Sequence, residues 1–309
     1  MALDFLTRNK LETGFGTDIV NATSYDDVLY QAGLDWTVEA CKTYTELNGT
    51  SIEIPKTNTI VRVEDGQPLG IVSDKYKLVQ NKDAFAFTEL IFNTKNIQFV
   101  KGGVYKGGAA TWLQAKLDGD YSILGDKAEC SLVFFNSHNG KGSIRTLIFP
   151  YRLACANALN LPIKSAARNW RCVHTGDPNK KIKEAQEVLC AGSTYMEAIK
   201  REAEYLQQIK LTNAQIDNFT ARLFPITDDM TDRQKDNQML RREQLIQVYV
   251  EKDDLQNFGP TGYKYISAVV DYIDHVEGKN TKTANVNRFI SVACGNPFVD
   301  KAYDMVISA

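Results

Sequence analysis

The segment from Cys130 to Phe149 decides the fold of this chain, because it encodes two neighbouring strands. It reads Cys130-Ser-Leu-Val-Phe-Phe135, then Asn136-Ser-His-Asn-Gly-Lys-Gly142, then Ser143-Ile-Arg-Thr-Leu-Ile-Phe149. Apolar and β-branched residues fill both ends, and the middle is rich in the glycine and asparagine that turns require. The pattern predicts an antiparallel hairpin. After Pro150, the alanine-rich stretch Tyr151–Asn160 is expected to form a short buried helix.

More strands are predicted on the N-terminal side of this hairpin. Apolar alternation and turn residues place them at Ser51–Ile54, Thr59–Val63, Leu69–Val72, Lys75–Val79, Ile97–Val100, Val104–Tyr105 and Ala110–Leu117. Lys101-Gly-Gly103 is expected to be a turn between two of these strands. One helix is predicted to begin at the cap residue Ser24, and a second one at the cap residue Asn81. The short connections favour antiparallel neighbours.

From about residue 181 the apolar spacing becomes helical. Helices are predicted over Lys181–Leu211 with a break at Gly192–Thr194, over Asn213–Leu223 after the cap Thr212, over Thr231–Gln256, over Thr261–His275, and in two short stretches at the end of the chain. The many apolar residues of Thr261–His275 predict that much of this helix is buried. The predicted fold class is therefore α+β. We expect an α+β sheet domain at residues 1–180 and a helical part at residues 181–309 that packs on or beside it.

A second feature of the sequence is a tract of positive charge that begins next to the hairpin. From Lys141 to Lys183 the chain carries nine Lys or Arg and the single acid Asp177, a local charge of +8. The whole chain has a formal charge of −2, so the remainder carries −10. Exposed charges are screened beyond about 8 Å at physiological salt. A ligand therefore senses the local tract more than the total charge.

This basic tract predicts a groove for a nucleic-acid backbone. The predicted binding residues are Lys141, Arg145, Arg152, Lys164, Arg168, Trp170, Arg171, Lys180 and Lys181. Lys and Arg side chains neutralise phosphates and release counterions, which makes such binding depend on salt. Trp170 could stack on bases. Two other interpretations stay open: the tract pairs with acids of the helical half or of a neighbouring copy, or it binds an acidic partner protein.

The turn Ser137-His-Asn-Gly-Lys-Gly142 also has two interpretations. Its glycines permit positive φ, and the surrounding amides could hold a phosphate. It does not match the phosphate-binding loop, in which the lysine precedes Ser or Thr and a helix follows. The simpler interpretation is a hairpin turn that carries His138 at the surface.

The sequence predicts no catalytic, metal or cofactor site. Cys155 lies between two alanines, which is typical of an inert buried thiol rather than of a nucleophile with His138 or His174 as its base. Asp271 and His275 lie four residues apart on one predicted helix, and we expect a buried pair that holds this helix against the sheet. The expectation is a protein that is not an enzyme.

Several segments of this chain match a known family in order and spacing. They are Ala32-Gly-Leu-Asp-Trp36, Asp74-Lys-Tyr-Lys-Leu-Val-Gln-Asn81 with Phe85, Ser137-His-Asn-Gly140, Arg152-Leu-Ala-Cys-Ala-Asn-Ala-Leu159 and Ala268-Val-Val-Asp-Tyr-Ile-Asp-His275. Together they resemble the phage/plasmid-like proteins, a family of unknown function, and the resemblance implies a mobile-element protein inside a bacterial cell. The order of hairpin, helix and basic run also resembles Rad-type single-strand annealing proteins and their phage relatives, which form rings or filaments around a basic groove.

These observations lead to one expected function and one alternative. We expect a cytoplasmic protein of a phage or plasmid that binds or anneals single-stranded DNA as a homo-oligomer. Widely spread cysteines, and the lack of a signal peptide or a membrane-spanning run, agree with the cytoplasm. The alternative is a phage protein-interaction module, such as an inhibitor of host defence or an assembly component, that binds no nucleic acid.

Overall fold

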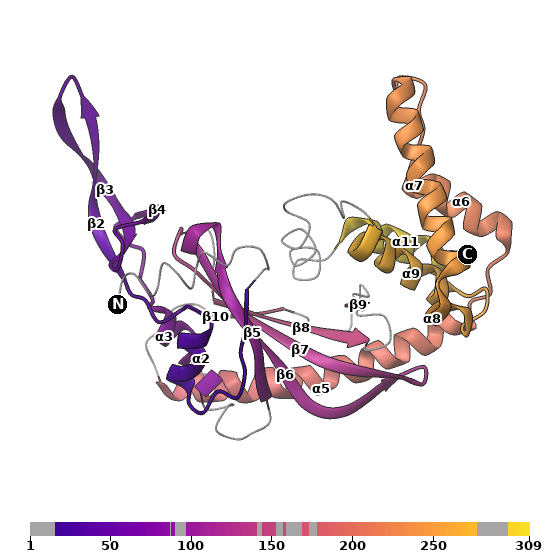
Figure 1. Cartoon of the computed structure of the whole chain (residues 1–309), viewed down its shortest axis with the longest axis horizontal. Helices are drawn as coiled ribbons and strands as arrows, with labels where there is room; N and C mark the ends of the chain where they lie inside the picture. Colours follow the sequence, from indigo (N-terminus) through magenta and orange to yellow (C-terminus); the bar gives the residue numbers. More distant parts are fainter. Residues whose placement is uncertain are drawn as a thin grey trace. The chain divides into compact units, whose positions relative to one another are not determined.

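The computed structural model describes residues 16–86, 88–89, 97–140, 144–152, 157–158, 169–172, 178–276 and 296–309. Within these residues the fold is α+β, as the sequence predicts. Strands predominate up to residue 172, and the chain from residue 178 onward is helical (Figure 1).

A large sheet forms around the predicted hairpin. Its strands are β1 (Thr17–Asp18), β5 (Ile97–Tyr105), β6 (Ala110–Ile123), β7 (Asp126–Ser137), β8 (Ile144–Arg152), β9 (Asn157–Ala158) and β10 (Asn169–Cys172). Their order is β1-β5-β6-β7-β8-β10, and β9 also pairs with β8. The hairpin prediction is confirmed, since β7 and β8 are consecutive neighbours in this order.

Two glycines predicted to form a turn lie inside a strand instead. Gly102 and Gly103 belong to β5, where they pair with Leu113 and Trp112 of β6. A Cβ on Gly102 would lie 2.7 Å from the Cβ of Ala32, which ends helix α2 (Tyr25–Gln31). Glycine is therefore needed here because a helix end packs closely on the strand, and no turn is formed.

The predicted helix over Tyr151–Asn160 is also wrong. Tyr151 and Arg152 end β8, and β9 returns antiparallel to them with Ala158 opposite Tyr151 and Asn157 opposite Arg152. The residues between them lie outside the described part. Pairing with a neighbouring strand here overrides the helical preference of alanine, since intrinsic propensity is a weak force compared with tertiary contacts.

A second sheet contains β2 (Val38–Leu47), β3 (Thr50–Arg62) and β4 (Pro68–Ser73) in that order. Asn48 and Gly49 join β2 to β3 with φ of 53° and 77°, as a type I′ turn requires. Because β4 pairs only with Thr57–Val61, the outer half of the β2–β3 hairpin extends past it (Figure 1). The structure merges two predicted strands into β3 and shows no strand at Lys75–Val79.

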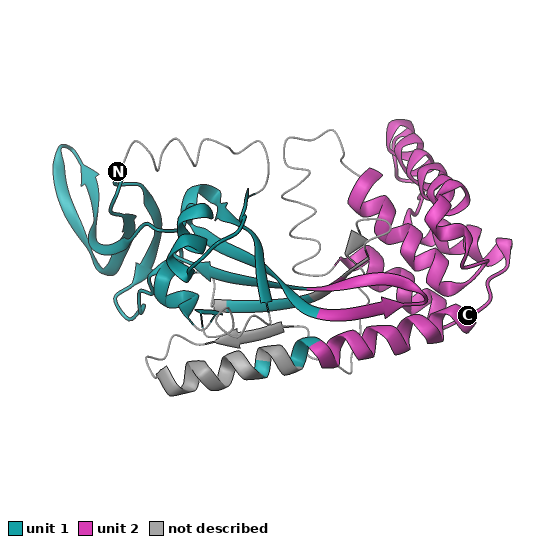
Figure 2. Ribbon diagram, turned by 60° about the horizontal axis from the view of Figure 1, so that its bottom comes forward, with its two compact units in different colours: residues 1–118, 131–148, 168–192 teal, residues 119–130, 149–167, 193–309 magenta. Residues whose placement is uncertain are grey.

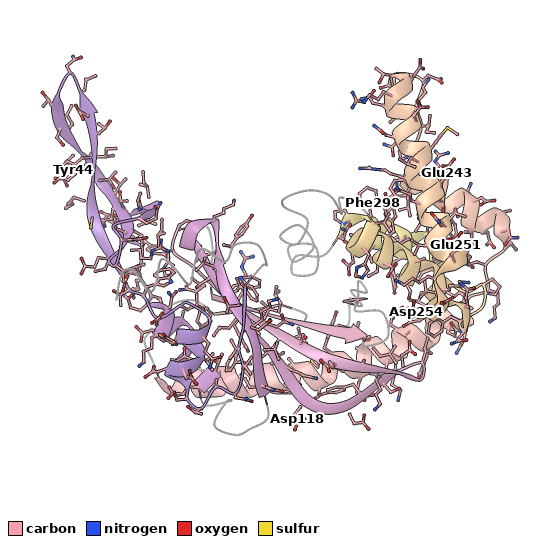
Figure 3. The ribbon with its side chains drawn as sticks, in the orientation of Figure 1. Tyr44, Asp118, Glu243, Glu251, Asp254 and Phe298 are labelled. Atoms are coloured by element: carbon pink, nitrogen blue, oxygen red, sulfur yellow. The ribbon has the colours of Figure 1, made fainter. Side chains whose placement is uncertain are left out.

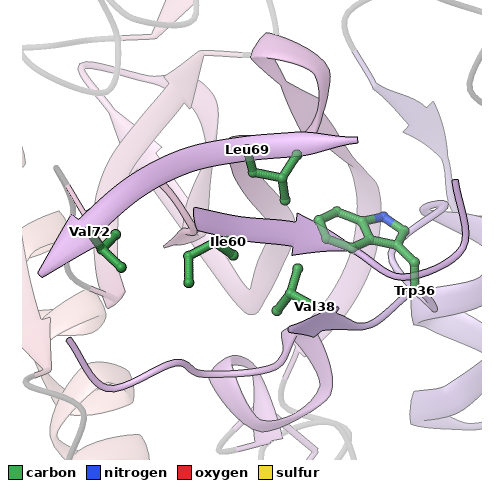
Figure 4. Packing of buried hydrophobic residues seen from close by; sticks show 5 residues of the cluster. All are labelled: Trp36, Val38, Ile60, Leu69 and Val72. Carbon is green, nitrogen blue, oxygen red and sulfur yellow. The ribbon is translucent and has the colours of Figure 1, made fainter. Parts of the chain in front are cut away.

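A small apolar core holds this sheet together. It contains Trp36, Val38, Ile60, Leu69 and Val72, which converge from both sides of β3 (Figure 4). Tyr76 and Leu78 pack against the cluster from the segment that was predicted to be a strand. That segment is fixed by side chains instead of a backbone ladder, because the Tyr76 hydroxyl donates to the Ser137 carbonyl at 2.8 Å.

Helix α5 (Pro178–Gln208) runs for 31 residues without the predicted break at Gly192–Thr194. Tyr195, Met196 and Ile199 are buried directly after the glycine. With Ala203 and Leu206 they form one buried apolar face after the glycine, so the helical spacing prevails over the local cost of glycine, which is about 1 kcal/mol.

The C-terminal helices are α6 (Asn213–Leu223), α7 (Asp232–Glu251), α8 (Asp253–Gln256), α9 (Gly262–Asp271), a π-helical turn at Tyr272–Val276 and α11 (Pro297–Ile307). Thr212 caps α6 as predicted, and it forms a reciprocal capping box with Gln215. The long helix predicted to reach Gln256 is interrupted at Lys252, whose backbone is extended. Every residue of α9 is buried, which confirms the prediction of a largely buried helix.

The chain forms two compact units that interleave along the sequence (Figure 2). One contains residues 1–118, 131–148 and 168–192, and the other contains residues 119–130, 149–167 and 193–309. Strands β6, β7 and β8 and helix α5 each continue from one unit into the other. Across the described ranges, no helix has the length and apolarity that a bilayer crossing requires.

Candidate nucleic-acid interface

The described part of the basic tract lies at one end of the large sheet. Strand β8 has β7 on one side, and on the other side it pairs with β10 near its start and with β9 at its end. Four of the nine predicted residues are on these strands: Arg145 and Arg152 on β8, and Trp170 and Arg171 on β10. The sheet therefore joins residues that are about 25 positions apart in sequence.

The register places two arginines opposite each other. In the antiparallel pair of β8 and β10, Arg171 is the Cα partner of Arg145. Directly opposed residues have Cβ atoms about 4.5–5.5 Å apart, and like charges at such positions are destabilising. The Arg145 side chain is half-buried. The register thus places two basic residues opposite each other at this edge of the sheet.

Trp170 is one step out of phase with this pair. Its Cα partner is Thr146, whose side chain is fully buried. Successive positions of a strand belong to opposite faces of the sheet. The backbone register therefore assigns Trp170 and the two arginines to different faces, so that the sheet does not bring all three together.

The remaining predicted residues are distributed differently. Arg152 ends β8 opposite Asn157 and belongs to the other compact unit. Lys180 and Lys181 lie in the first turn of α5, which contains no acidic residue. Lys141, Lys164 and Arg168 lie outside the described residues. The structure thus brings together the arginine pair, and it places two lysines at the start of a helix in the same unit.

His138 is not at the surface, contrary to the prediction. Its side chain is fully buried, and its Nε2 lies 2.9 Å from Oδ1 of Asn81. Its backbone N–H donates to the Ala109 carbonyl at 2.9 Å. The ring also packs at 5.3 Å from the indole of Trp36. The histidine that sequence reasoning assigned to a turn therefore connects that turn to the interior of the unit.

Asn81 is the centre of a buried polar network that sequence reasoning missed. The helix α3 (Asn81–Ala84) begins with this residue, and Gln80 occupies the cap position without a capping side-chain bond. The Asn81 side-chain amide donates to the Leu34 carbonyl at 3.2 Å, and its Oδ1 accepts from the Thr111 hydroxyl at 3.1 Å. Because Asn81 resembles a typical cap residue in sequence, only long-range contacts reveal this other role.

The network also indicates which group donates in the bond between His138 and Asn81. Since the Asn81 nitrogen donates to a carbonyl, its Oδ1 accepts the bond shared with His138. The His138 Nε2 is thus the donor at 2.9 Å, and its contact with the Asn136 amide nitrogen is longer, at 3.5 Å. A histidine held in this way between a strand end and a helix start serves the architecture of the loop, which favours the hairpin-turn interpretation of Ser137–Gly142.

Two glycines allow the same loop to pack closely against β4. A Cβ on Gly70 of β4 would lie 2.6 Å from the Asn139 Cα, and one on Gly140 would lie 2.9 Å from Val72 Cγ1. The loop backbone therefore contacts β4 directly. Such close contact supports a structural role for the loop residues up to Gly140; Lys141 and Gly142, which follow, lie outside the described part.

Cys155 and His174, the thiol and base weighed from the sequence, lie outside the described residues. Burial raises the pKa of the Cys130 thiol to about 12, which makes it a poor nucleophile. Asp271 lies 3.9 Å from His275 as predicted, but its nearer partner is Lys252 at 3.1 Å. The Asp271 carboxylate thus connects α9 to the junction of α7 and α8. Among the described residues, no three His, Cys, Asp or Glu side chains gather as metal ligands would.

One hollow of about 470 Å³ lies beside α2. Asp26, Asp35 and Gln80 are among the polar residues that line it. Asp26 pairs with Lys82 at 2.7 Å, and the Gln80 amide bonds the backbone of Val38. These polar groups are thus used within the fold, and the hollow shows no set of groups directed at a ligand.

Comparison with known proteins gives a family and no biochemical precedent. No curated protein and no solved structure matches the chain significantly. One family model matches residues 68–293, which contain β4, most of the large sheet and the helices up to α9. This match covers well over half of the sequence. The chain therefore belongs to the family described as domain of unknown function DUF932.

Proposed function

We propose that this chain is a phage or plasmid protein that binds single-stranded DNA by its backbone and anneals it as a homo-oligomer. The observation that carries the proposal is the direct opposition of Arg145 and Arg171 at the β8–β10 pair. The mobile-element origin rests on the resemblance of the sequence segments to phage/plasmid-like proteins.

Two arginines opposite each other on neighbouring strands offer a site for one phosphate of a nucleic-acid backbone. Guanidinium groups bind phosphate through two parallel N–H bonds, and such charge-assisted bonds are about twice as strong as neutral ones. Backbone capture of this kind leaves base edges unoccupied, which annealing requires.

The start of α5 supports the same proposal. Lys180 and Lys181 lie at the positive end of the helix dipole, where cations are disfavoured and anions are stabilised. The sequence adds Lys183 and lacks acids in this turn. The helix start and the arginine pair belong to one compact unit, so both can contribute to one positive field.

Salt-titrated binding to a single-stranded oligonucleotide tests the proposal. For single strands, the logarithm of affinity falls with the logarithm of salt by about 0.7 per neutralised phosphate. The double variant Lys180→Glu/Lys181→Glu should therefore bind weakly and show a slope smaller by about 1.4. Arg171→Ala should reduce the slope by about 0.7.

The matched control is Lys200→Glu/Arg201→Glu on the same helix. Both residues are exposed and belong to the other compact unit. This variant should keep the wild-type slope. If wild-type protein fails to bind at about 50 mM salt, or if both double variants weaken binding equally, the basic tract is not a nucleic-acid site.

A protein-interaction module is the second candidate. Within α7, the first residue with a buried side chain is Leu245, and Met239 and Leu240 are 52% and 51% exposed. Apolar side chains on a helix segment without a buried face favour contact with another protein. Absence of DNA binding, together with capture of a defined host protein that Met239→Glu/Leu240→Glu abolishes, would favour this candidate.

A further inference from the structure

Strand β2 forms an outer edge of the three-stranded sheet. Its neighbour is β3, and among the described residues no second strand pairs with it. Only Val38 and Thr43 are buried along its ten residues. Tyr44 is 57% exposed and projects from the β2–β3 hairpin (Figure 3), and Leu47 is 62% exposed. A long edge with exposed apolar side chains is a template for another strand.

The side chain of Gln80 shows which backbone groups face outward. Its amide accepts from the Val38 N–H at 2.9 Å and donates to the Val38 carbonyl at 2.8 Å. The backbone groups of Val38 therefore point away from β3. This direction alternates along an antiparallel pair, so the groups of Ala40 and Lys42 point outward as well. A register irregularity separates Lys42 from Tyr44, and beyond it the turn sets the direction: Leu47 and Thr50 flank the two-residue turn and face each other, so the groups of Tyr44 and Glu46 point outward.

The charges of this edge are arranged symmetrically around Tyr44. Lys42 lies two residues before it and Glu46 two residues after it. Lys42 pairs with Glu53 at 2.8 Å, and the hydrogen bond that the lysine donates to this carboxylate raises the pKa of the lysine. Glu46 has no ion pair among the described residues. If a second β2 strand ran antiparallel to this one, its Glu46 could lie opposite Lys42 and its Lys42 opposite Glu46, so the charges would be complementary.

We propose that two copies of this chain join through β2, in antiparallel pairing about a two-fold axis at Tyr44. Tyr44 then lies opposite Tyr44 of the second copy, and Lys42 opposite Glu46 of the second copy on both sides of the axis. All of these residues have outward backbone groups, so each pair exchanges both hydrogen bonds. The two sheets become one continuous sheet, and the contact is isologous.

Other registers are less favourable. An axis at Lys42 or at Glu46 places two like charges opposite each other, which destabilises a pair. The axis at Tyr44 also places Leu47 opposite the exposed Cys41 of the second copy. Two apolar side chains that are separately exposed thereby cover each other. The contact gives the homo-oligomer of the proposed function a defined interface, and it does not require nucleic acid.

Disulfide trapping tests the register. At the proposed axis, the two Cα atoms at position 44 lie about 5.5 Å apart, within the range of a disulfide. In a Cys41→Ser background, Tyr44→Cys should yield a covalent dimer under mild oxidation. Glu39→Cys in the same background is the control, because position 39 faces the turn beyond the end of the second strand. Equal trapping of both variants, or of neither, would refute the register.

Charge exchange tests the pairing without a crosslink. Lys42→Glu alone sets Glu opposite Glu, and Glu46→Lys alone sets Lys opposite Lys, so each variant should dimerise at least about tenfold more weakly than wild type. Their mixture restores opposite charges at both pairs and should form heterodimers. Glu39→Lys should dimerise as wild type does. The solution mass, measured without DNA, reports each result.

The outcomes separate this interface from the proposed function. A monomeric wild type at every accessible concentration, or a mixture that fails to associate, would overturn the interface whether or not DNA is bound. Dimers that bind no single-stranded DNA would overturn the proposed function and leave the interface intact. Association that needs the Arg171 side chain would place the contact elsewhere and would also count against β2 pairing.

Discussion

Asn81 connects three parts of its unit with one buried side chain. It donates to the Leu34 carbonyl, and it accepts from the Thr111 hydroxyl and from the His138 ring. Removing one member of a buried network leaves the others without partners, and each such group costs about 1–3 kcal/mol. Contacts of this kind are invisible in sequence because their partners are 30 to 57 residues away.

We therefore expect Asn81→Ala to lower the free energy of unfolding by about 2–3 kcal/mol. Urea unfolding followed by circular dichroism measures the change. Lys82→Ala is the neighbouring control, since the Lys82 side chain is exposed and pairs with the exposed Asp26. A loss for Asn81→Ala no larger than that for Lys82→Ala would contradict the network.

The protonation assigned to His138 gives another residue-scale prediction. Because Nε2 donates to Asn81, a replacement that offers an N–H at the same distance along the side chain should retain the bond. His138→Gln is therefore expected to be more stable than His138→Asn, whose amide is shorter. The same unfolding measurement ranks the two variants, and the reverse order would show that the bond from position 138 to Asn81 does not stabilise the fold.

The Asp65 carboxyl determines the direction in which the stability of this region changes with pH. Two hydrogen bonds from Arg62, at 2.9 and 2.6 Å, hold the pKa of the Asp65 carboxyl below its usual range. A carboxyl with a depressed folded pKa stabilises the protein above its unfolded pKa of about 3.9, and this contribution is lost as the pH falls through the folded value. Asp65→Asn should thus be destabilising at pH 7, and the difference from wild type should shrink toward pH 3. A difference that is constant with pH would contradict this assignment.

At the scale of elements, some helices and strands are determined by local sequence signals, and others by the strand with which they pair. The cap of α6 can be predicted from sequence, because Thr212 and Gln215 satisfy each other's backbone groups within one turn. The end of β8 cannot, because the segment after Pro150 becomes a strand only through its contact with β9. In α5, the apolar face that is buried after Gly192 outweighs the cost of this one glycine, so the helix continues through it.

Thr212→Ala should therefore cost about 1 kcal/mol of stability, since it removes an N-cap hydrogen bond. Asn213→Ala, at the first position within the helix, is the control and should have a smaller effect. Thermal unfolding compares the two variants. Equal effects would show that the capping box does not stabilise this helix.

At the scale of the whole molecule, burial and the proposed contact between two copies should decide which backbone amides are protected from hydrogen exchange. Every residue of α9 is buried, whereas β2 exposes its backbone edge among the described residues. Amide hydrogen exchange in Gly262–Asp271 should be slow at any protein concentration. Exchange at Lys42, Tyr44 and Glu46 should slow as concentration rises, because the second copy would then occupy their outward groups. Exchange in β2 that is independent of concentration would contradict the proposed contact.

The sequence alone determined the fold class, the β7–β8 hairpin, the α6 cap and the buried α9, because turn residues, caps and apolar periodicity act over a few neighbouring positions. It also determined the charge of the basic tract. Only the tertiary structure decided that Arg171 lies opposite Arg145, that His138 is buried against Asn81, and that β2 has an open edge. Each of these depends on strand register or on contacts between distant residues, and a register is fixed by the packing of whole elements and not by any local pattern.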